Sequence, residues 1–260
     1  MSDEASTDTV ADIAADIAAG RAKRLTDAAR DRSFAYLRPR DAATLILVDR
    51  SHSVPKVLLG RRHQGHKFMP GKFVFPGGRV EIADRAMPTA APLHDSDVAR
   101  LMRRMQRPSP AKAAAFALAA IRETYEETGL MLGVRRTDKI VAPSGAWSAF
   151  AEARILPDLG ALHFITRAIT PPGRPRRFDS RFFAADVSAV AHRAEGIVGP
   201  DAELVELVWL PITEARRLDM PTITAVALEE LQDRAATGMS RDHPVPFFRM
   251  LHNRFVRETL

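Results

Sequence analysis

The feature that most constrains this chain is the run Arg-Glu-Thr-Tyr-Glu-Glu-Thr-Gly-Leu at positions 122–130. On a helix, Glu123, Glu126 and Glu127 share one face, because residues three and four positions apart are neighbours there. Three carboxylates on one face repel one another unless a cation neutralises them. A hard divalent cation prefers such oxygen ligands on a rigid element. The run therefore indicates either a metal site or a solvated acidic face that is offset by Arg122 and nearby arginines.

The other face of the same helix is apolar. It carries Ala114, Ala117, Leu118, Ile121 and Tyr125. Ser109 followed by Pro110 is a typical helix start, with the serine as N-cap and the proline in the first turn. Gly129 stands where a C-cap glycine ends a helix. We therefore predict a long helix from Pro110 to the residue before Gly129, packed into a core through its apolar face.

The composition is typical of a globular protein without covalent cross-links. The 260 residues are 46% hydrophobic and 27% charged, which is enough for a substantial core. The absence of cysteine excludes disulfides, thiolate nucleophiles and Cys-ligated metals. The net charge is +6 and most of the cationic residues are arginines, whose planar guanidinium suits phosphate. This balance fits a phosphorylated ligand, nucleic acid or a plain arginine-rich bias, and does not decide between them.

Nothing in the sequence predicts a membrane or secretory segment. Apolar runs such as residues 44–48 fall far short of the roughly 20 residues that a membrane-spanning helix needs. The first residues, Met-Ser-Asp-Glu, are acidic where a secretory signal is basic. We expect a cytoplasmic protein without a membrane partner.

Strand and helix signals are mixed along the chain, which predicts an α/β or α+β domain with helical additions at both ends. Strands are expected over residues 42–48, 56–60, 72–75, 162–169, 181–185 and 204–210. Further helices are expected over residues 8–32, 96–106, 222–236 and 246–259. The expected organisation is an N-terminal helical extension (1–40), a main domain (41–215, with a helical insertion at 85–109) and C-terminal helices (216–260) packed on the same domain.

Residues 75–84 and 122–130 make the chain resemble the Nudix hydrolases. The conserved box of that family reads Gly, five residues, Glu, seven residues, then Arg-Glu-U-x-Glu-Glu-x-Gly-U, where U is a bulky aliphatic residue. Residues 122–130 match its second half at every fixed position except Thr124. Phe-Pro-Gly-Gly at 75–78 matches its start, with Gly77 leading into Gly78, the first glycine of the box. Asp84 replaces the first glutamate, and 37 residues instead of seven separate it from Arg122. We expect this insertion to be a surface excursion that leaves the site intact.

The resemblance implies a mixed β-sheet sandwiched between helices and a metal-dependent active site. Glu123, Glu126 and Glu127 would bind Mg²⁺ or Mn²⁺ together with a backbone oxygen near Gly78, and Arg122 would steady the cluster. The metal would polarise a diphosphate and lower the pKa of an attacking water. Glu123 is the candidate for orienting or deprotonating that water.

The family also implies one carboxylate from outside the box. Glu203, which precedes the strand expected at 204–210, and Glu195, in the preceding loop, are the two candidates. For both, a plain surface role is the alternative.

The substrate is suggested by a second, partial resemblance, to coenzyme A diphosphatases. Leu-Leu-Gly-Arg-Arg at 58–62 followed by Lys67 is loosely similar to an extra signature of that subfamily, so Arg61 and Lys67 are candidate substrate-binding residues. Coenzyme A carries a 3′-phosphate beyond its diphosphate. Arg174, Arg176 and Arg177, held between prolines, could bind that phosphate. The alternative for this loop is a stiff, solvated hairpin turn.

The expected function is therefore hydrolysis of a nucleoside diphosphate linkage, with coenzyme A or acyl-coenzyme A as the substrate. The products would be adenosine 3′,5′-bisphosphate and (acyl-)4′-phosphopantetheine. Alternatives are hydrolysis of a dinucleotide or ADP-sugar, and a non-catalytic nucleotide-binding regulator. A nucleic-acid partner is not expected, because few aromatic residues lie among the basic ones. A homodimer formed through the extra helices stays open.

Overall fold

The computed structural model describes residues 10–28, 33–66 and 69–260. The helices are α1 (Val10–Ala28), α2 (Asp95–Met102), α3 (Pro110–Thr128), α4 (Ala146–Glu152), α5 (Ile212–Ala215) and α6 (Thr222–Ala236). The strands are β1 (Arg40–Asp49), β2 (Lys56–Arg62), β3 (Phe73–Val74), β4 (Gly77–Arg79), β5 (Leu130–Leu132), β6 (Val134–Arg135), β7 (Ile155–Leu156), β8 (His163–Ile169), β9 (Phe178–Asp186), β10 (Val190–Arg193), β11 (Leu204–Pro211), β12 (Pro246–Leu251) and β13 (Arg254–Thr259).

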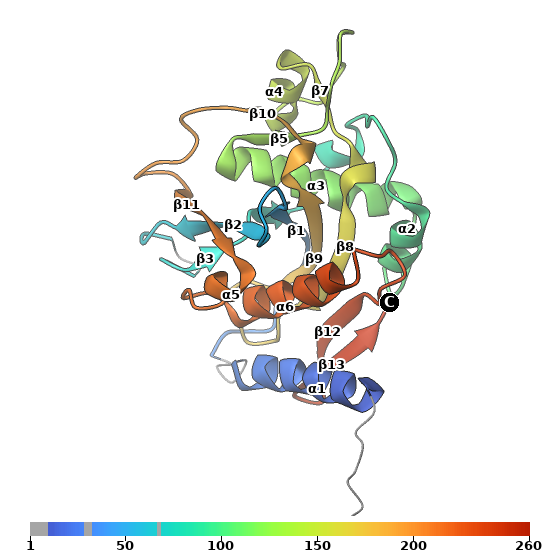
Figure 1. Ribbon diagram of the computed structural model, residues 1–260, viewed down its shortest axis with the longest axis vertical. Coiled ribbons are helices and arrows are strands. Elements are labelled where there is room, and N and C mark those ends of the chain that lie inside the picture. The colour runs from blue at the N-terminus through green and yellow to red at the C-terminus, as the bar shows by residue number, and fades with distance from the viewer. Residues whose placement is uncertain (1–9, 29–32, 67–68) are drawn as a thin grey trace, which may run out of the picture.

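A mixed sheet forms the middle layer of the molecule (Figure 1). Its strand order is β11-β2-β1-β9-β8-β12-β13, and the short strands β3 and β4 pair with β2 and β1. The pairs β1–β9 and β8–β12 are parallel, and the other pairs in this sheet are antiparallel. Two further two-stranded sheets, β5–β10 and β6–β7, lie outside it.

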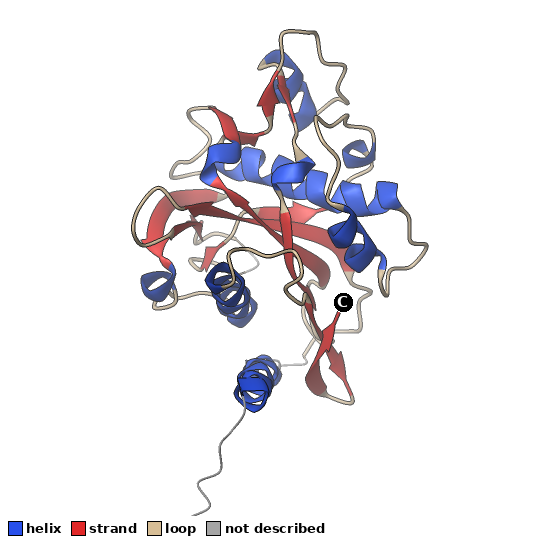
Figure 2. Cartoon of the chain, turned by 45° about the vertical axis from the view of Figure 1, so that its right-hand side comes forward, coloured by secondary structure: helices blue, strands red, loops and turns tan. Residues whose placement is uncertain are grey.

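Helices cover both faces of this sheet, as Figure 2 shows with α3 above it and α6 below. Successive residues of β1 point to opposite faces, because side chains alternate along a strand. Leu45 and Leu47 pack in the cluster that contains α3 residues, whereas Ile46 and Val48 pack in the cluster that contains α6 residues. The mixed sheet between helices that the sequence predicts is confirmed, and β1 is buried on both faces.

The boundaries predicted for the long helix are also confirmed. The Ser109 hydroxyl accepts a hydrogen bond from the backbone N–H of Lys112 at 3.1 Å, which caps the start of α3. Gly129 ends the helix with φ of 77°, in the left-handed region that glycine adopts without strain. Because both ends are fixed, the direction in which α3 presents each side chain is fixed as well.

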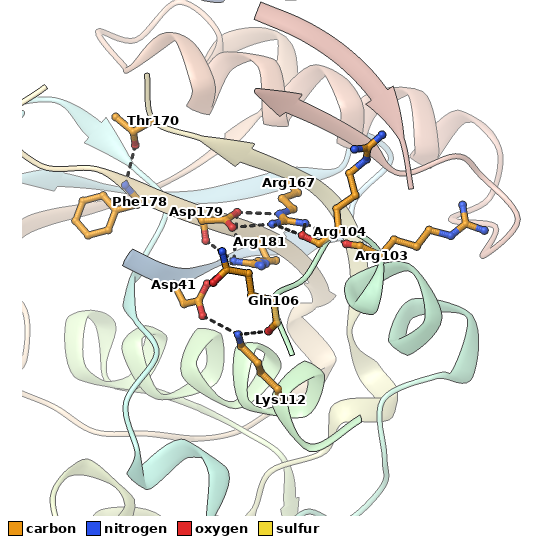
Figure 3. A network of polar contacts seen from close by, with 10 residues as sticks. All are labelled: Asp41, Arg103, Arg104, Gln106, Lys112, Arg167, Thr170, Phe178, Asp179 and Arg181. Carbon is orange, nitrogen blue, oxygen red and sulfur yellow. Dashed lines mark hydrogen bonds and ion pairs between the residues drawn. The ribbon is translucent and has the colours of Figure 1, made fainter. Parts of the chain in front are cut away.

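A polar network attaches the start of α3 to the sheet (Figure 3). Lys112 Nζ lies 3.4 Å from Asp41 Oδ2 on β1, and Arg181 Nη1 on β9 lies 3.1 Å from Asp41 Oδ1. Arg167 on β8 binds Asp179 through two hydrogen bonds of 2.8 and 2.7 Å. The network therefore links α3 to three neighbouring strands, which sets the position of the helix over β1.

The insertion between the two halves of the box belongs to the core, so the expectation of a surface excursion is wrong. It contains α2, and its apolar side chains Met87, Leu93, Leu101 and Met105 are buried in the same cluster as the inner face of α3. Asp97 on α2 is buried too, with Arg241 Nη1 2.5 Å from its Oδ2. These long-range contacts anchor the insertion.

The predicted C-terminal helix over residues 246–259 is also wrong, because this segment is the hairpin β12–β13. Leu251 pairs with Arg254 across a two-residue turn, and His252 and Asn253 have φ of 44° and 64°. Positive φ at both central residues is typical of the type I′ hairpin turn. Strand β12 is stabilised further by parallel pairing with β8. Of the predicted C-terminal helices, α6 is confirmed with the predicted boundaries.

Helix α1 packs against α6 and β13, at the opposite end of the chain. The buried guanidinium of Arg21 contacts Glu229, Glu230 and Asp233 of α6, at distances between 2.7 and 3.0 Å. The N- and C-terminal additions are therefore packed against each other. None of the helices in the described ranges is long and apolar enough to cross a bilayer.

Candidate active site

The glycine turn and the glutamates of α3, which are far apart in the sequence, meet in space. Strand β4 pairs with β1 so that Gly78 lies opposite Ala43, and α3 packs over the same part of β1. A Cβ atom on Gly78 would lie 2.4 Å from the carboxylate of Glu123. The N–H of Gly77 donates a hydrogen bond to Glu127 Oε2 at 3.4 Å. The sheet register thus places the Gly-Gly turn against two of the three helix glutamates.

A fourth carboxylate, that of Glu203, reaches the same place from the segment just before β11. Arg62 Nη2 on the neighbouring strand β2 holds Glu203 Oε1 at 2.7 Å. The charge of Glu203 is one of the influences that raise the pKa values of Glu123 and Glu127. The other candidate, Glu195, lies exposed in the loop after β10 and is not among the carboxylates that act on these two glutamates.

Two of the helix glutamates are in an environment that disfavours their charge. Burial raises the pKa of Glu123 to about 7, Arg122 opposes this, and Glu126 and Glu203 add to it. Burial also raises the pKa of Glu127 well above its usual range, and the charges of Glu203 and Glu123 act in the same direction. A cation among these oxygens would offset both effects.

Arg122 is the hub of the site. Its Nη1 donates to Glu123 Oε1 at 2.8 Å and to Glu126 Oε2 at 2.5 Å, and its Nη2 donates to the carbonyl of Arg79 at 2.7 Å. Burial works against its charge, but the carboxylates of Asp84, Glu123 and Glu126 outweigh burial and raise the pKa of Arg122. Arg122 is therefore a permanent counter-ion that fixes the positions of two glutamates.

Asp84 lies behind Arg122 and is fully buried. Its carboxylate accepts hydrogen bonds from Arg122 Nε at 2.8 Å, from the N–H of Glu81 at 2.7 Å and from Trp147 Nε1 at 3.1 Å. These contacts indicate that Asp84 holds the guanidinium of Arg122 in its orientation. Trp147, on α4, is a member of this buried cluster that the sequence analysis missed. A buried indole N–H needs an acceptor, but the sequence alone does not show which one.

The residues at this site fit a hard divalent cation in the chemistry of their donors. Four carboxylates and the backbone of the Gly-Gly turn supply the oxygen ligands that Mg²⁺ and Mn²⁺ prefer. As they lie, however, no group of three His, Asp or Glu side chains in the described ranges is placed to hold a metal ion. In place of a metal ion, Arg122 pairs with Glu123 and Glu126, and Arg62 pairs with Glu203. Metal binding would thus require a rearrangement of these side chains.

The residues predicted to bind substrate are not brought to one place. Arg61 Nε pairs with Glu206 at 2.8 Å, and Lys67 lies outside the described residues. Arg174 donates to the carbonyl of Ala28. The guanidinium of Arg177 donates to the carbonyls of Thr170 at 2.9 Å and Leu37 at 2.5 Å.

Arg176 differs from these two neighbours. Its side chain is exposed and engages no partner among the described residues. Arg176 is therefore the side chain of the predicted arginine loop that remains available to a ligand.

Comparison with known proteins gives relatives of one kind. No protein-family model matches the chain. A solved structure of a NUDIX hydrolase from Alicyclobacillus acidocaldarius is 31% identical to this chain, with a TM-score of 0.56, and the match covers 74% of this chain and 90% of that one. The acyl-coenzyme A diphosphatase NUDT19 of Xenopus laevis is 26% identical over 212 residues, which are 62% of this chain. The match covers 53% of that relative's length.

Proposed function

This chain belongs to the Nudix hydrolase family, and on that premise we propose that it is a metal-dependent hydrolase that cleaves the diphosphate of coenzyme A or acyl-coenzyme A. The observation that carries the proposal is the meeting of the Gly77–Gly78 turn with Glu123 and Glu127 across the sheet register. The products would be adenosine 3′,5′-bisphosphate and (acyl-)4′-phosphopantetheine.

The proposed roles of the side chains follow from their contacts. Glu123, Glu126, Glu127 and Glu203 would hold Mg²⁺ or Mn²⁺, together with backbone oxygens of the glycine turn. When bound, such an ion stabilises charge on phosphoryl oxygens and lowers the pKa of a water molecule. Glu123 lies against Gly78, where its carboxylate can orient the attacking water and accept its proton. Arg122 would remain the counter-ion beside Glu123 and Glu126, and the hydrogen bonds of its Nη1 to both carboxylates would rearrange when the metal binds.

Two observations support coenzyme A as the substrate within the family. One curated relative is an acyl-coenzyme A diphosphatase. Residues 58–78 resemble an extra signature of coenzyme A diphosphatases in part.

Substrate turnover tests the proposal directly. The purified chain is incubated with Mg²⁺ or Mn²⁺ and with coenzyme A, an acyl-coenzyme A, NADH or ADP-ribose, and the products are identified by mass spectrometry. We expect adenosine 3′,5′-bisphosphate from the coenzyme A substrates and no turnover after addition of a chelator. Faster cleavage of NADH or ADP-ribose would assign the protein to dinucleotides or ADP-sugars instead. Binding without turnover of any substrate would indicate a nucleotide-binding regulator.

A further inference from the structure

A hollow of about 660 Å³ opens beside the glycine turn, and most of its polar lining is arginine. Arg38 and Arg40 come from the start of β1 and the segment before it, Arg79 from β4, and Arg176 from the loop between β8 and β9. In the sequence these residues are spread over three separate segments. The fold alone brings them together.

The four arginines Arg38, Arg40, Arg79 and Arg176 are exposed, and their side chains make no ion pair or hydrogen bond with any described residue. This differs from many other arginines of the chain, which pair with carboxylates. The nearby carboxylate of Asp41 is already engaged by Arg181 and Lys112. Four unpaired cations around one hollow repel one another, so an anion that binds there gains from all of them.

The walls of the hollow are held rigidly by a fifth arginine. Arg177 is buried, donates to the carbonyls of Thr170 and Leu37, and stacks on the ring of Tyr36 at 4.9 Å. The N–H of Arg40 also donates to the carbonyl of Arg177 at 2.9 Å. These contacts join the segment that carries Arg38 and Arg40 to the loop that carries Arg176. The free guanidinium groups are therefore presented from a fixed backbone.

The hollow adjoins β4, the strand that carries the glycine turn, although no glutamate of α3 lines it. A second hollow, of about 610 Å³, shares Arg40 and Arg79 with the first and extends to the turn at 80–83, which leads into Asp84. Arg79 directly follows Gly78, at a Cα separation of about 3.8 Å. The carbonyl of Arg79 is bound by Arg122. Because Gly78 and Arg79 face opposite sides of β4, a substrate whose diphosphate lies at the glycine turn would have to pass the edge of β4 to bring another anionic group to these arginines.

We propose that Arg38, Arg40, Arg79 and Arg176 form a subsite for a phosphomonoester that the substrate carries beyond its diphosphate. This inference rests on the proposed function and deepens it, since coenzyme A carries such a group as its 3′-phosphate. Guanidinium groups bind phosphate oxygens through paired, charge-assisted hydrogen bonds. Arg174 and Arg177, which the sequence analysis assigned to this phosphate, are instead occupied by backbone carbonyls. Glu81 is the exposed carboxylate at the rim of the second hollow.

The test measures binding, so it does not depend on turnover. Affinities for adenosine 3′,5′-bisphosphate and adenosine 5′-phosphate are determined by titration calorimetry in the presence of a chelator. We expect the intact protein to bind the bisphosphate at least about tenfold more tightly, because hydrogen bonds to a charged phosphate contribute on that scale. The double variant Arg40→Gln/Arg79→Gln should lower the affinity for the bisphosphate and reduce this ratio to near one.

A matched variant separates the subsite from overall charge. Arg217→Gln/Arg254→Gln removes the same charge at two exposed arginines elsewhere and should keep the ratio of the intact protein. Failure of the intact protein to bind the bisphosphate more tightly, or an equal loss of the ratio in both double variants, would overturn the subsite.

The proposed function fails in a different way. If coenzyme A is not cleaved but the affinity ratio and its loss are observed, the substrate assignment is wrong and the subsite stands. If coenzyme A is cleaved and the ratio is near one in the intact protein, the subsite is wrong and the function stands.

Discussion

Arg122 holds Asp84 through a two-point contact, in which Nε donates to Oδ1 at 2.8 Å and Nη2 donates to Oδ2 at 3.2 Å. Both side chains are buried, so each charge relies on the other in place of water. The opposite side of the same guanidinium holds Glu123 and Glu126. The acid that replaces the usual first glutamate of the box is thus connected to the helix carboxylates through a single arginine.

Replacement of Asp84 by asparagine should destabilise the fold and disturb the site together. Asn keeps the size of the side chain but leaves the buried charge of Arg122 without its nearest counter-ion, which typically costs about 3–5 kcal/mol. We expect the free energy of unfolding in urea to fall by that order. Asp138→Asn, at an exposed carboxylate, is the control and should behave as the intact protein. Unchanged stability of Asp84→Asn would show that the pair does not support the core.

Glu126→Gln should sharply reduce metal-dependent turnover while the fold stays intact. The side chain of Glu126 is 43% exposed, so loss of its charge costs little stability. Loss of one oxygen ligand to the cation should lower kcat on the order of a hundredfold. Mn²⁺ should raise the Tm of the intact protein and of the control Glu214→Gln, but not that of Glu126→Gln. Turnover at the rate of the intact protein would remove Glu126 from the metal site.

The two glycines of the turn should respond differently to alanine. At Gly78 the new methyl group meets the carboxylate of Glu123, a side-chain end that can move aside. Gly78→Ala should therefore keep the Tm and lose turnover. At Gly77 the methyl group would lie 2.6 Å from the carbonyl oxygen of Ala43, which is backbone. Gly77→Ala should lower the free energy of unfolding by about 1–3 kcal/mol. Equal stability of the two variants in urea would contradict the register of β4.

The stability of the fold should decline in mild acid, in part through His163. Burial and the charges of Arg241 and Arg234 lower the pKa of His163 to about 4. Between an unfolded value near 6.5 and about 4, only the unfolded chain binds this proton, so the free energy of unfolding falls as the pH falls. His163→Gln should weaken that dependence in urea unfolding at about pH 7 and about pH 5. The control His52→Gln, at an exposed histidine, should leave the pH dependence of the free energy of unfolding unchanged. An identical pH dependence in the intact protein and both variants would refute the assignment.

Local chemistry made much of the site predictable from the sequence. The cap at Ser109 and the glycine at 129 are set by contacts within a few residues, so the limits of α3 could be predicted. The spacing of Glu123, Glu126 and Glu127 follows from helix geometry alone. The residues from 246 to 259 were misassigned because a short apolar segment fits either period. There, the polar pair His252-Asn253 between two short segments that each contain apolar residues was the available signal for a hairpin.

Long-range register accounts for what the sequence could not show. Trp147 reaches Asp84 only because α4 packs beside α3. Arg38, Arg79 and Arg176 come together only because β1 lies between β4 and β9. No local pattern encodes which strands become neighbours, so these contacts had to come from coordinates.

Helix α1 has a protective consequence for the sheet. Strand β13 is the outermost strand at one end of the sheet, and its free side would offer unpaired amides to the strand of another molecule. The N–H of Phe255 in β13 is instead bonded to the hydroxyl of Thr26 on α1, at 2.8 Å. The helix thereby covers part of this edge, and a chain without it would leave the edge open to pairing with a strand of another copy.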